Sequence, residues 1–217
     1  MSVTPTPDEA GPTLQLPSGT ELPLFPLQTV LFPGGLLQLK VFEARYLDLI
    51  SHCLRQQAPF GVVCIVQGSE LRAGKDMPQL ETTAVLAHLQ EVDAEQAGIL
   101  RVRCLGGRRV QLVKPHQRTD GLWLAEATAC PDDLPAAVPP ELAASAAALA
   151  QAIESLAATG QHPFTPPYRL DDAGWVANRW CEILPISLAA RYRLMRLDEP
   201  LLRLKLVDDF LRSKGLV

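Results

Sequence analysis

Beyond residue 20, hydrophobic and polar positions first alternate and later recur with a helical period. Leu37, Leu39 and Val41 alternate with Gln38 and Lys40, which is the two-residue period of a strand with one buried face. Alternating or continuously apolar runs predict further strands at residues 60–66, 83–92, 99–105, 110–113 and 122–129. Short strands at this spacing, with one early helix, predict a compact mixed barrel.

The early helix begins at Glu43, where the period changes from two residues to between three and four. The apolar positions that would form its buried face are Tyr46 or Leu47, Ile50, and Cys53 or Leu54. This spacing is typical of a helix that packs one face against a sheet.

Prolines interrupt the apolar segment at residues 21–35. Pro23 and Pro26 lie within it, and Pro33 precedes two glycines. Because proline has no amide hydrogen to give to a neighbouring strand, we predict a short edge strand and then a fixed loop, not a central strand.

A glycine pair, Gly106-Gly107, follows one of the predicted strands. Paired glycines accept positive φ at little cost, so this pair predicts the turn between two strands. Arg108 and Arg109 come directly after it, and at the start of the next strand of a hairpin they would be exposed.

After Cys130 the pattern becomes helical. Residues 141–158 are rich in alanine, with larger apolar residues at helical spacing: Leu142, Ala146, Leu149, Ile153 and Leu156. Three shorter helices are predicted at residues 172–184, 187–197 and 199–212. Ser187 and Asp198 are the predicted N-caps of the last two, and the acid pairs Asp132-Asp133 and Asp171-Asp172 are also interpreted as caps.

These patterns divide the chain into four segments and predict an α+β fold. The segments are a flexible tail (1–20), a β-rich barrel domain (21–130), a Pro-rich linker (131–140) and a helical bundle domain (141–217). The tail is rich in Pro and Thr and has little to bury.

Composition and charge narrow the classes of function. The net charge is -4, and both parts, divided at Cys130, hold slightly more acidic than basic residues. A nucleic-acid binder needs clustered Lys and Arg, so we expect no nucleic-acid partner. The absence of a long apolar stretch or a signal peptide predicts a cytoplasmic protein with no membrane contact, and five widely spaced cysteines fit a reducing compartment.

Catalytic chemistry is sparse in the sequence. The four histidines are scattered, and none has metal-ligand spacing with another His or Cys. Gly68 and Gly74-Lys75 depart from the spacing of a phosphate-binding loop, and Asp76 stands where Ser or Thr is required. We therefore predict no cofactor, no metal, no catalytic residues and no enzymatic activity.

Several motifs together resemble the amino-terminal domain of Lon protease. The opening ones are LPLFPL (22–27), VLFPGG (30–35) and VFEARY (41–46). Agreement continues at residues 60–63, 83–84, 106–110, 183–187 and 198–204. The resemblance implies a PUA-like β pseudobarrel followed by a helical bundle, without the ATPase and protease domains of a full Lon protease.

In function, the resemblance implies a non-catalytic module that recognises unfolded or tagged protein segments, with a protease or chaperone as a further partner. A cleft between barrel and bundle is expected to bind them. The predicted substrate-binding residues are Phe32, Pro33, Tyr46, Arg109 and Trp123. An RNA-binding PUA-like protein and an uncharacterised hydrolase remain as alternatives.

Overall fold

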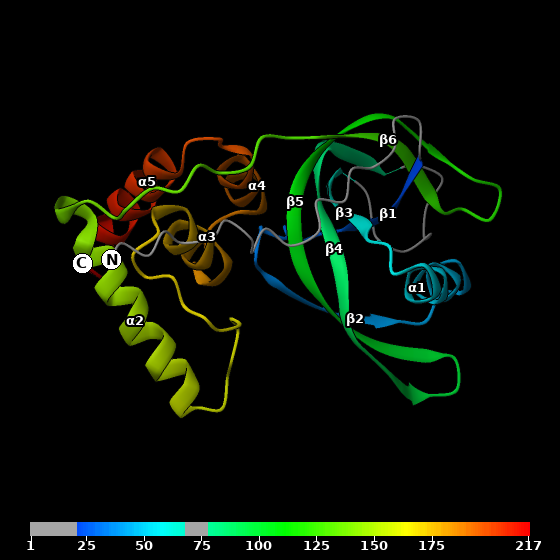
Figure 1. The fold of residues 1–217 in the computed structure, drawn as a ribbon, viewed down its shortest axis with the longest axis horizontal. Helices are drawn as coiled ribbons and strands as arrows, with labels where there is room; N and C mark the ends of the chain where they lie inside the picture. Colours follow the sequence, from blue (N-terminus) through cyan, green and yellow to red (C-terminus); the bar gives the residue numbers. More distant parts are fainter. Residues whose placement is uncertain (1–20, 68–77) are drawn as a thin grey trace, which may run out of the picture.

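The computed structural model describes residues 21–67 and 78–217, which form a β-rich lobe and a helical lobe (Figure 1). The predicted tail (1–20) and the segment from Gly68 to Asp76 that was compared with a phosphate loop lie outside the described residues. The strands are β1 (Glu21–Leu27), β2 (Leu36–Val41), β3 (Phe60–Gln67), β4 (Gln79–Gln96), β5 (Ile99–Gln117) and β6 (Trp123–Ala129). The helices are α1 (Ala44–Gln56), the short 3₁₀ turn η1 (Pro140–Leu142), α2 (Ala143–Ala158), α3 (Ala173–Ile183), α4 (Leu188–Arg196) and α5 (Pro200–Ser213).

The six strands form one mixed sheet in the order β2-β5-β4-β3-β1-β6. Strand β5 also pairs with β6, which closes five of the strands into a barrel. Strand β2 pairs with the first half of β5 and with no other described strand, so its second edge is free.

The prediction of an edge strand at the amino-terminal end was wrong, because β1 has a neighbour on each side. Residues 21–24 pair antiparallel with β6, and residues 24–27 pair parallel with β3. The two ladders overlap only at Leu24, so each half of β1 has one unpaired edge. Pro23 and Pro26 fit a strand of this kind, since a proline nitrogen that faces an unpaired edge costs no ladder hydrogen bond.

The predicted turn at Gly106-Gly107 was also wrong, because β5 runs through both residues. The pairing of β5 with β4 shifts register between Ala87↔Gly106 and Val85↔Arg109, which places a bulge at the glycines. Glycine is needed for a different reason: a Cβ at Gly106 would lie 2.2 Å from the Phe32 carbonyl oxygen. Gly106 therefore lets the loop at residues 28–35 lie directly against the barrel.

The four long helices after α1 appear where the sequence predicted them, but only some predicted caps hold. Asp172 accepts a hydrogen bond from the Trp175 amide at 2.7 Å, and Ser187 accepts one from the Ala190 amide at 3.2 Å. The predicted cap Asp198 does not cap α5, whose N-cap residue is Glu199. Asp198 instead pairs with Arg109, because the barrel brings that guanidinium to the start of α5.

One large apolar cluster continues from the barrel into the helical lobe, so the two lobes share a core. Phe32 and Ile50 belong to it from the barrel side, and Leu149, Val176 and Leu204 belong to it from the helical side. A second, smaller cluster, which includes Trp123, is formed by residues of all five strands that close into the barrel. The relative position of the lobes is therefore fixed by packing.

Candidate functional site

Two buried arginines and a half-buried aspartate connect the lobes. Arg109 of β5 and Arg203 of α5 both bind Asp133, which lies in the segment between the lobes. The distances are 3.0 Å from Arg109 Nη2 to Asp133 Oδ1 and 2.6 Å from Arg203 Nη1 to Asp133 Oδ2. The two arginine side chains are 3% and 1% exposed, and we call this cluster the joint.

The remaining donors of the joint are occupied by the chain itself. Arg109 donates to the carbonyl oxygens of Pro131 at 3.0 Å and Met195 at 3.2 Å. Arg203 donates to Leu194 O and to Asn178 Oδ1, both at 2.9 Å. The prediction of an exposed Arg109 was therefore wrong. The predicted capping role of Asp133 was also wrong, because its carboxylate neutralises the two buried arginines.

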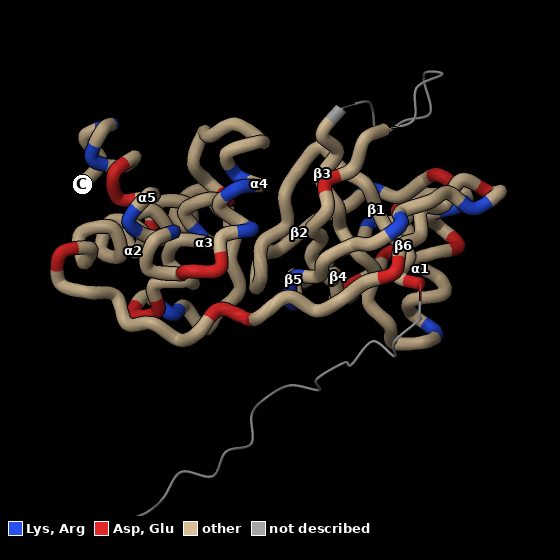
Figure 2. The backbone as a smooth tube through the Cα atoms, turned by 90° about the horizontal axis from the view of Figure 1, so that it is seen from above, with Lys and Arg blue, Asp and Glu red and all other residues tan. Residues whose placement is uncertain are grey.

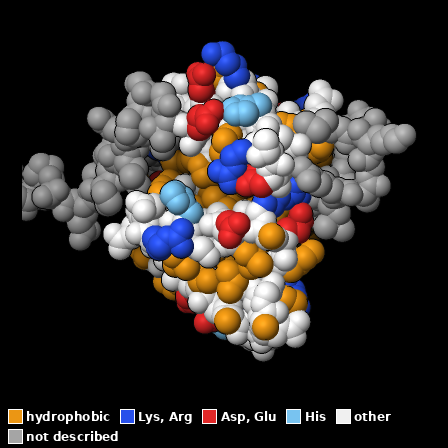
Figure 3. All heavy atoms as spheres, turned by 90° about the vertical axis from the view of Figure 1, so that its right-hand side faces the viewer, with side chains coloured by type: hydrophobic (Ala, Val, Ile, Leu, Met, Phe, Trp, Pro, Cys, Tyr) orange, Lys and Arg blue, Asp and Glu red, His pale blue; other side chains and the backbone are white. Residues whose placement is uncertain are grey.

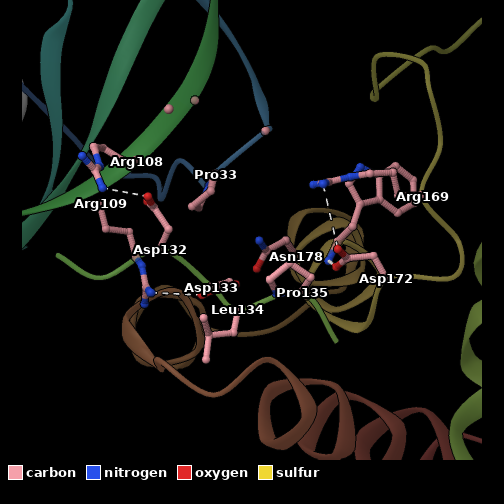
Figure 4. A pocket seen from close by; sticks show the side chains of 15 residues that line it. Pro33, Arg108, Arg109, Asp132, Asp133, Leu134, Pro135, Arg169, Asp172 and Asn178 are labelled. Carbon is pink, nitrogen blue, oxygen red and sulfur yellow. Dashed lines mark hydrogen bonds and ion pairs between the residues drawn. The ribbon is translucent and has the colours of Figure 1, made fainter. Parts of the chain in front are cut away.

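A cavity of about 280 Å³ lies next to the joint, and we call it the joint pocket (Figure 4). Its charged side chains pair with each other across the pocket wall. Arg108 binds Asp132 at 2.7 Å, and Arg169 lies 3.9 Å from Asp172. Asp132 is thus a surface ion-pair partner and not the predicted helix cap. Because paired charged side chains make up much of its wall, the joint pocket offers little apolar surface to an apolar ligand.

A different hollow lies between β1 and β2. Two adjacent cavities of about 280 and 310 Å³ share Thr29, Leu37 and Gln38 in their walls, and we call them together the seam groove. Most of the other lining residues are apolar: Phe25, Pro26, Leu27, Val30, Leu31, Leu36, Leu39, Val41, Phe42, Tyr46, Pro163, Phe164 and Ile183. Unlike the joint pocket, the seam groove offers mainly apolar surface.

Phe42 lies at one end of the seam groove and is 54% exposed. Figure 3 shows hydrophobic side chains gathered over the lower part of the barrel end, on the side where β2 and the β4–β5 hairpin lie in Figure 1. An aromatic ring exposed beside an apolar groove is typical of a surface that another molecule covers.

The free edge of β2 forms one border of the seam groove. The hydrogen bond from Gly106 N–H to the Gly35 carbonyl, at 2.8 Å, fixes which residues of β2 direct their backbone groups toward β5. Because backbone groups alternate along an antiparallel strand, Gln38 and Lys40 direct their N–H and C=O groups away from β5. Both residues line the groove, and neither pairs with a further strand among residues 21–67 and 78–217.

The end of the seam groove near the helical lobe carries charge. Glu182 and Arg191 line it, and Glu182 pairs with buried Arg179 at 2.7 Å. Burial raises the pKa of the Glu182 carboxyl to about 7, although the two arginines act in the opposite direction. Arg179 also donates to the Pro33 carbonyl at 2.9 Å, which ties the loop at residues 28–35 to α3.

The structure does not bring the five predicted binding residues into one groove. Pro33 and Arg109 line the joint pocket, whereas Tyr46 lines the seam groove and stacks on Phe25 at 4.0 Å between ring centroids. Phe32 is fully buried in the large core, and Trp123 is 7% exposed in the smaller one. Aromatic residue type alone therefore did not distinguish core from groove.

Sequence reasoning missed Phe42 and the free edge of β2. A signal for Phe42 was present, because an apolar residue there continues the exposed series of Gln38 and Lys40. The free edge had no local signal, since it depends on which strands fail to pair with β2 in three dimensions.

The cysteines bear on the hydrolase alternative. Burial raises the pKa of the Cys53 and Cys64 thiols to about 11 and of the Cys104 and Cys181 thiols to about 12. These thiols are protonated at neutral pH and so are poor nucleophiles. Within the described part of the chain, no cluster of His, Cys, Asp and Glu is suited to hold a metal ion.

Comparison with known proteins identifies the family. The profile for the ATP-dependent protease La (LON) substrate-binding domain matches residues 21–213. The chain belongs to this family. A crystal structure of a Lon N-terminal domain protein from Xanthomonas campestris is 32% identical, with a TM-score of 0.69 over 87% of this chain and 96% of that one.

A second structure supports the fold alone. The N-terminal domain of a Lon protease from the Mycobacterium avium complex is 15% identical, with a TM-score of 0.63 over 89% of this chain and 99% of that one. No curated protein matches the chain by sequence. The α+β fold and the resemblance to Lon amino-terminal domains are thereby confirmed.

Membership in this family makes the chain a substrate-recognition module and does not favour the RNA-binding alternative. Figure 2 shows Lys and Arg interspersed with Asp and Glu over both lobes, and a basic face is not evident among the residues it describes. RNA affinity would depend on such a face. In the described residues no helix is both long and apolar enough to cross a bilayer.

Proposed function

We propose that the chain is a non-catalytic module that binds extended apolar segments of unfolded or tagged proteins in the seam groove. The observation that carries the proposal is the free edge of β2 beside an apolar groove. Backbone groups at that edge would pair with a bound segment as an added strand, and the groove would take its alternate side chains.

Two features support the seam groove over the joint pocket. The charges of the joint pocket are already paired within the chain, whereas Phe42 is exposed at the seam groove. Displacing paired charges costs free energy, whereas covering exposed apolar surface releases it. A protease or chaperone would act on segments held this way, in the cytoplasm.

Binding of fluorescein-labelled extended peptides, measured by fluorescence anisotropy, tests the proposal. An apolar, β-branched peptide is expected to bind, and a Ser- and Gly-rich peptide of equal length is not. The Phe42→Ser variant is expected to bind the apolar peptide about tenfold more weakly, because a large part of an aromatic contact is lost.

Val113→Ser provides the matched control, since Val113 is also exposed, at 41%, but lies on β5 outside the seam groove. This variant is expected to bind as tightly as the unchanged protein. Equal losses in the two variants, or no binding of any apolar peptide, would contradict the proposal.

A further inference from the structure

The outer face of α5 exposes leucines that nothing in the described structure covers. Leu201 and Leu206 are each 46% exposed, and Leu202 is 41% exposed. The opposite face of the helix is buried through Leu204, Val207 and other residues, where α5 packs in the helical lobe. Figure 1 shows α5 at the end of the molecule away from the barrel, so this face is separate from the seam groove.

These exposed residues form two adjacent rows along α5, because residues four apart lie above one another on a helix. One row is Leu202, Leu206 and the partly buried Phe210. The other row is Leu201, Lys205 and Asp209. We call the two rows together the α5 face.

We propose that the α5 face is a dimer interface that pairs two copies of this chain through antiparallel α5 helices. In a twofold-symmetric contact the same patch meets itself, so each row meets the same row of the second copy in reverse. With the axis near Leu206, that leucine packs on its own copy, and Leu202 packs near Phe210 of the second chain.

Charge complementarity favours a second copy of this chain as the molecule that covers the α5 face. Lys205 and Asp209 lie four residues apart in one row, so the same symmetry places Lys205 of each copy beside Asp209 of the other. Within the chain, the described residues give Lys205 no ion-pair partner. The dimer would therefore contain two symmetry-related ion pairs at the edge of its apolar contact.

The size of the face makes this a concentration-dependent dimer. One helix face of 14 residues is small beside the interfaces of permanent dimers. Exposed leucines in adjacent rows still carry a free-energy gain when they are covered. The dimer would present two seam grooves, since the α5 face and the groove lie on different parts of the molecule.

Sedimentation equilibrium of the full chain over a wide concentration range tests the dimer. The unchanged protein is expected to show a monomer–dimer equilibrium. Leu206→Glu is expected to weaken it about hundredfold or more, because a carboxylate would be buried at the twofold axis. Leu54→Glu is the matched control, because Leu54 is 49% exposed on α1, outside the α5 face, and it is expected to leave the equilibrium unchanged.

A charge exchange tests the antiparallel arrangement and does not depend on the folding of the Leu206 variant. Lys205→Asp and Asp209→Lys are each expected to weaken the dimer about tenfold, because each places like charges side by side. The double variant is expected to regain the original affinity. A monomer at every concentration, a dimer that tolerates Leu206→Glu, or a double variant as weak as the single ones would overturn the proposal.

Discussion

The joint and the seam groove both border the barrel, and they differ in which polar and apolar groups lack a partner within the chain. At the joint, Arg109 and Arg203 donate to Asp133 and to backbone carbonyl oxygens, so the charges are compensated within the chain. At the seam groove, the outward backbone groups of β2 and the ring of Phe42 have no comparable partner among the described residues. Residue type is therefore a poor guide to function until the partners of each residue are known.

The largest expected effect is a loss of folding stability when the joint is broken. Asp133→Ala would leave buried Arg203 without its carboxylate and Arg109 with Asp198 alone. Breaking a buried pair in this way typically costs about 3–5 kcal/mol of unfolding free energy. Urea unfolding followed by circular dichroism measures this loss. Asp132→Ala is the matched control, because its ion pair with Arg108 is exposed and is expected to contribute less than about 1 kcal/mol.

The same pair of variants sharpens the comparison when peptide binding is measured. Under conditions where both variants are folded, neither is expected to change the affinity for the apolar peptide, because the joint lies outside the seam groove. A folded Asp133→Ala protein that has lost peptide binding would move the candidate site from the seam groove to the joint pocket.

A smaller effect is expected at the free edge of β2. Lys40→Pro removes an N–H group that points away from β5, so the β2–β5 ladder keeps its hydrogen bonds while an added strand loses one. Peptide affinity measured by anisotropy is expected to fall about tenfold relative to Lys40→Ala. Both variants lose the ion pair between Lys40 and Glu95, so the comparison isolates the N–H group.

If Lys40→Pro and Lys40→Ala bind the peptide equally well, strand addition at β2 is wrong even though the groove can still bind by side-chain contact. If neither binds, the side chain of Lys40 carries the interaction instead. A thermal unfolding curve for each variant establishes that β2 remains in place.

Periodicity was sufficient to predict most elements of this fold. Alternation at residues 37–41 and the apolar spacing at 141–158 depend only on which faces are buried, and the structure has a strand and a helix there. The errors at β1 and at the glycine pair have a different origin. Gly106 allows a close contact with Phe32, more than 70 residues away, and β1 changes its neighbour at Leu24.

The candidate site was less predictable for the same physical reason. Tyr46 belongs to the opening motif and lines the seam groove from a helix. The ion-pair partners of Arg109, in contrast, are 24 and 89 positions away in the sequence, at Asp133 and Asp198. Residue type indicates what a guanidinium can bind, whereas only the fold shows that its partners are already inside the chain.

Amide hydrogen exchange with and without the apolar peptide shows whether the peptide adds a strand at β2. The peptide is expected to slow exchange at the Gln38 and Lys40 amides, which face the free edge, and to leave the amides of Gly34 and Gly107 at the joint pocket unchanged. A peptide that binds while Gln38 and Lys40 exchange at their free rates, or that protects the joint pocket instead, would contradict strand addition at β2.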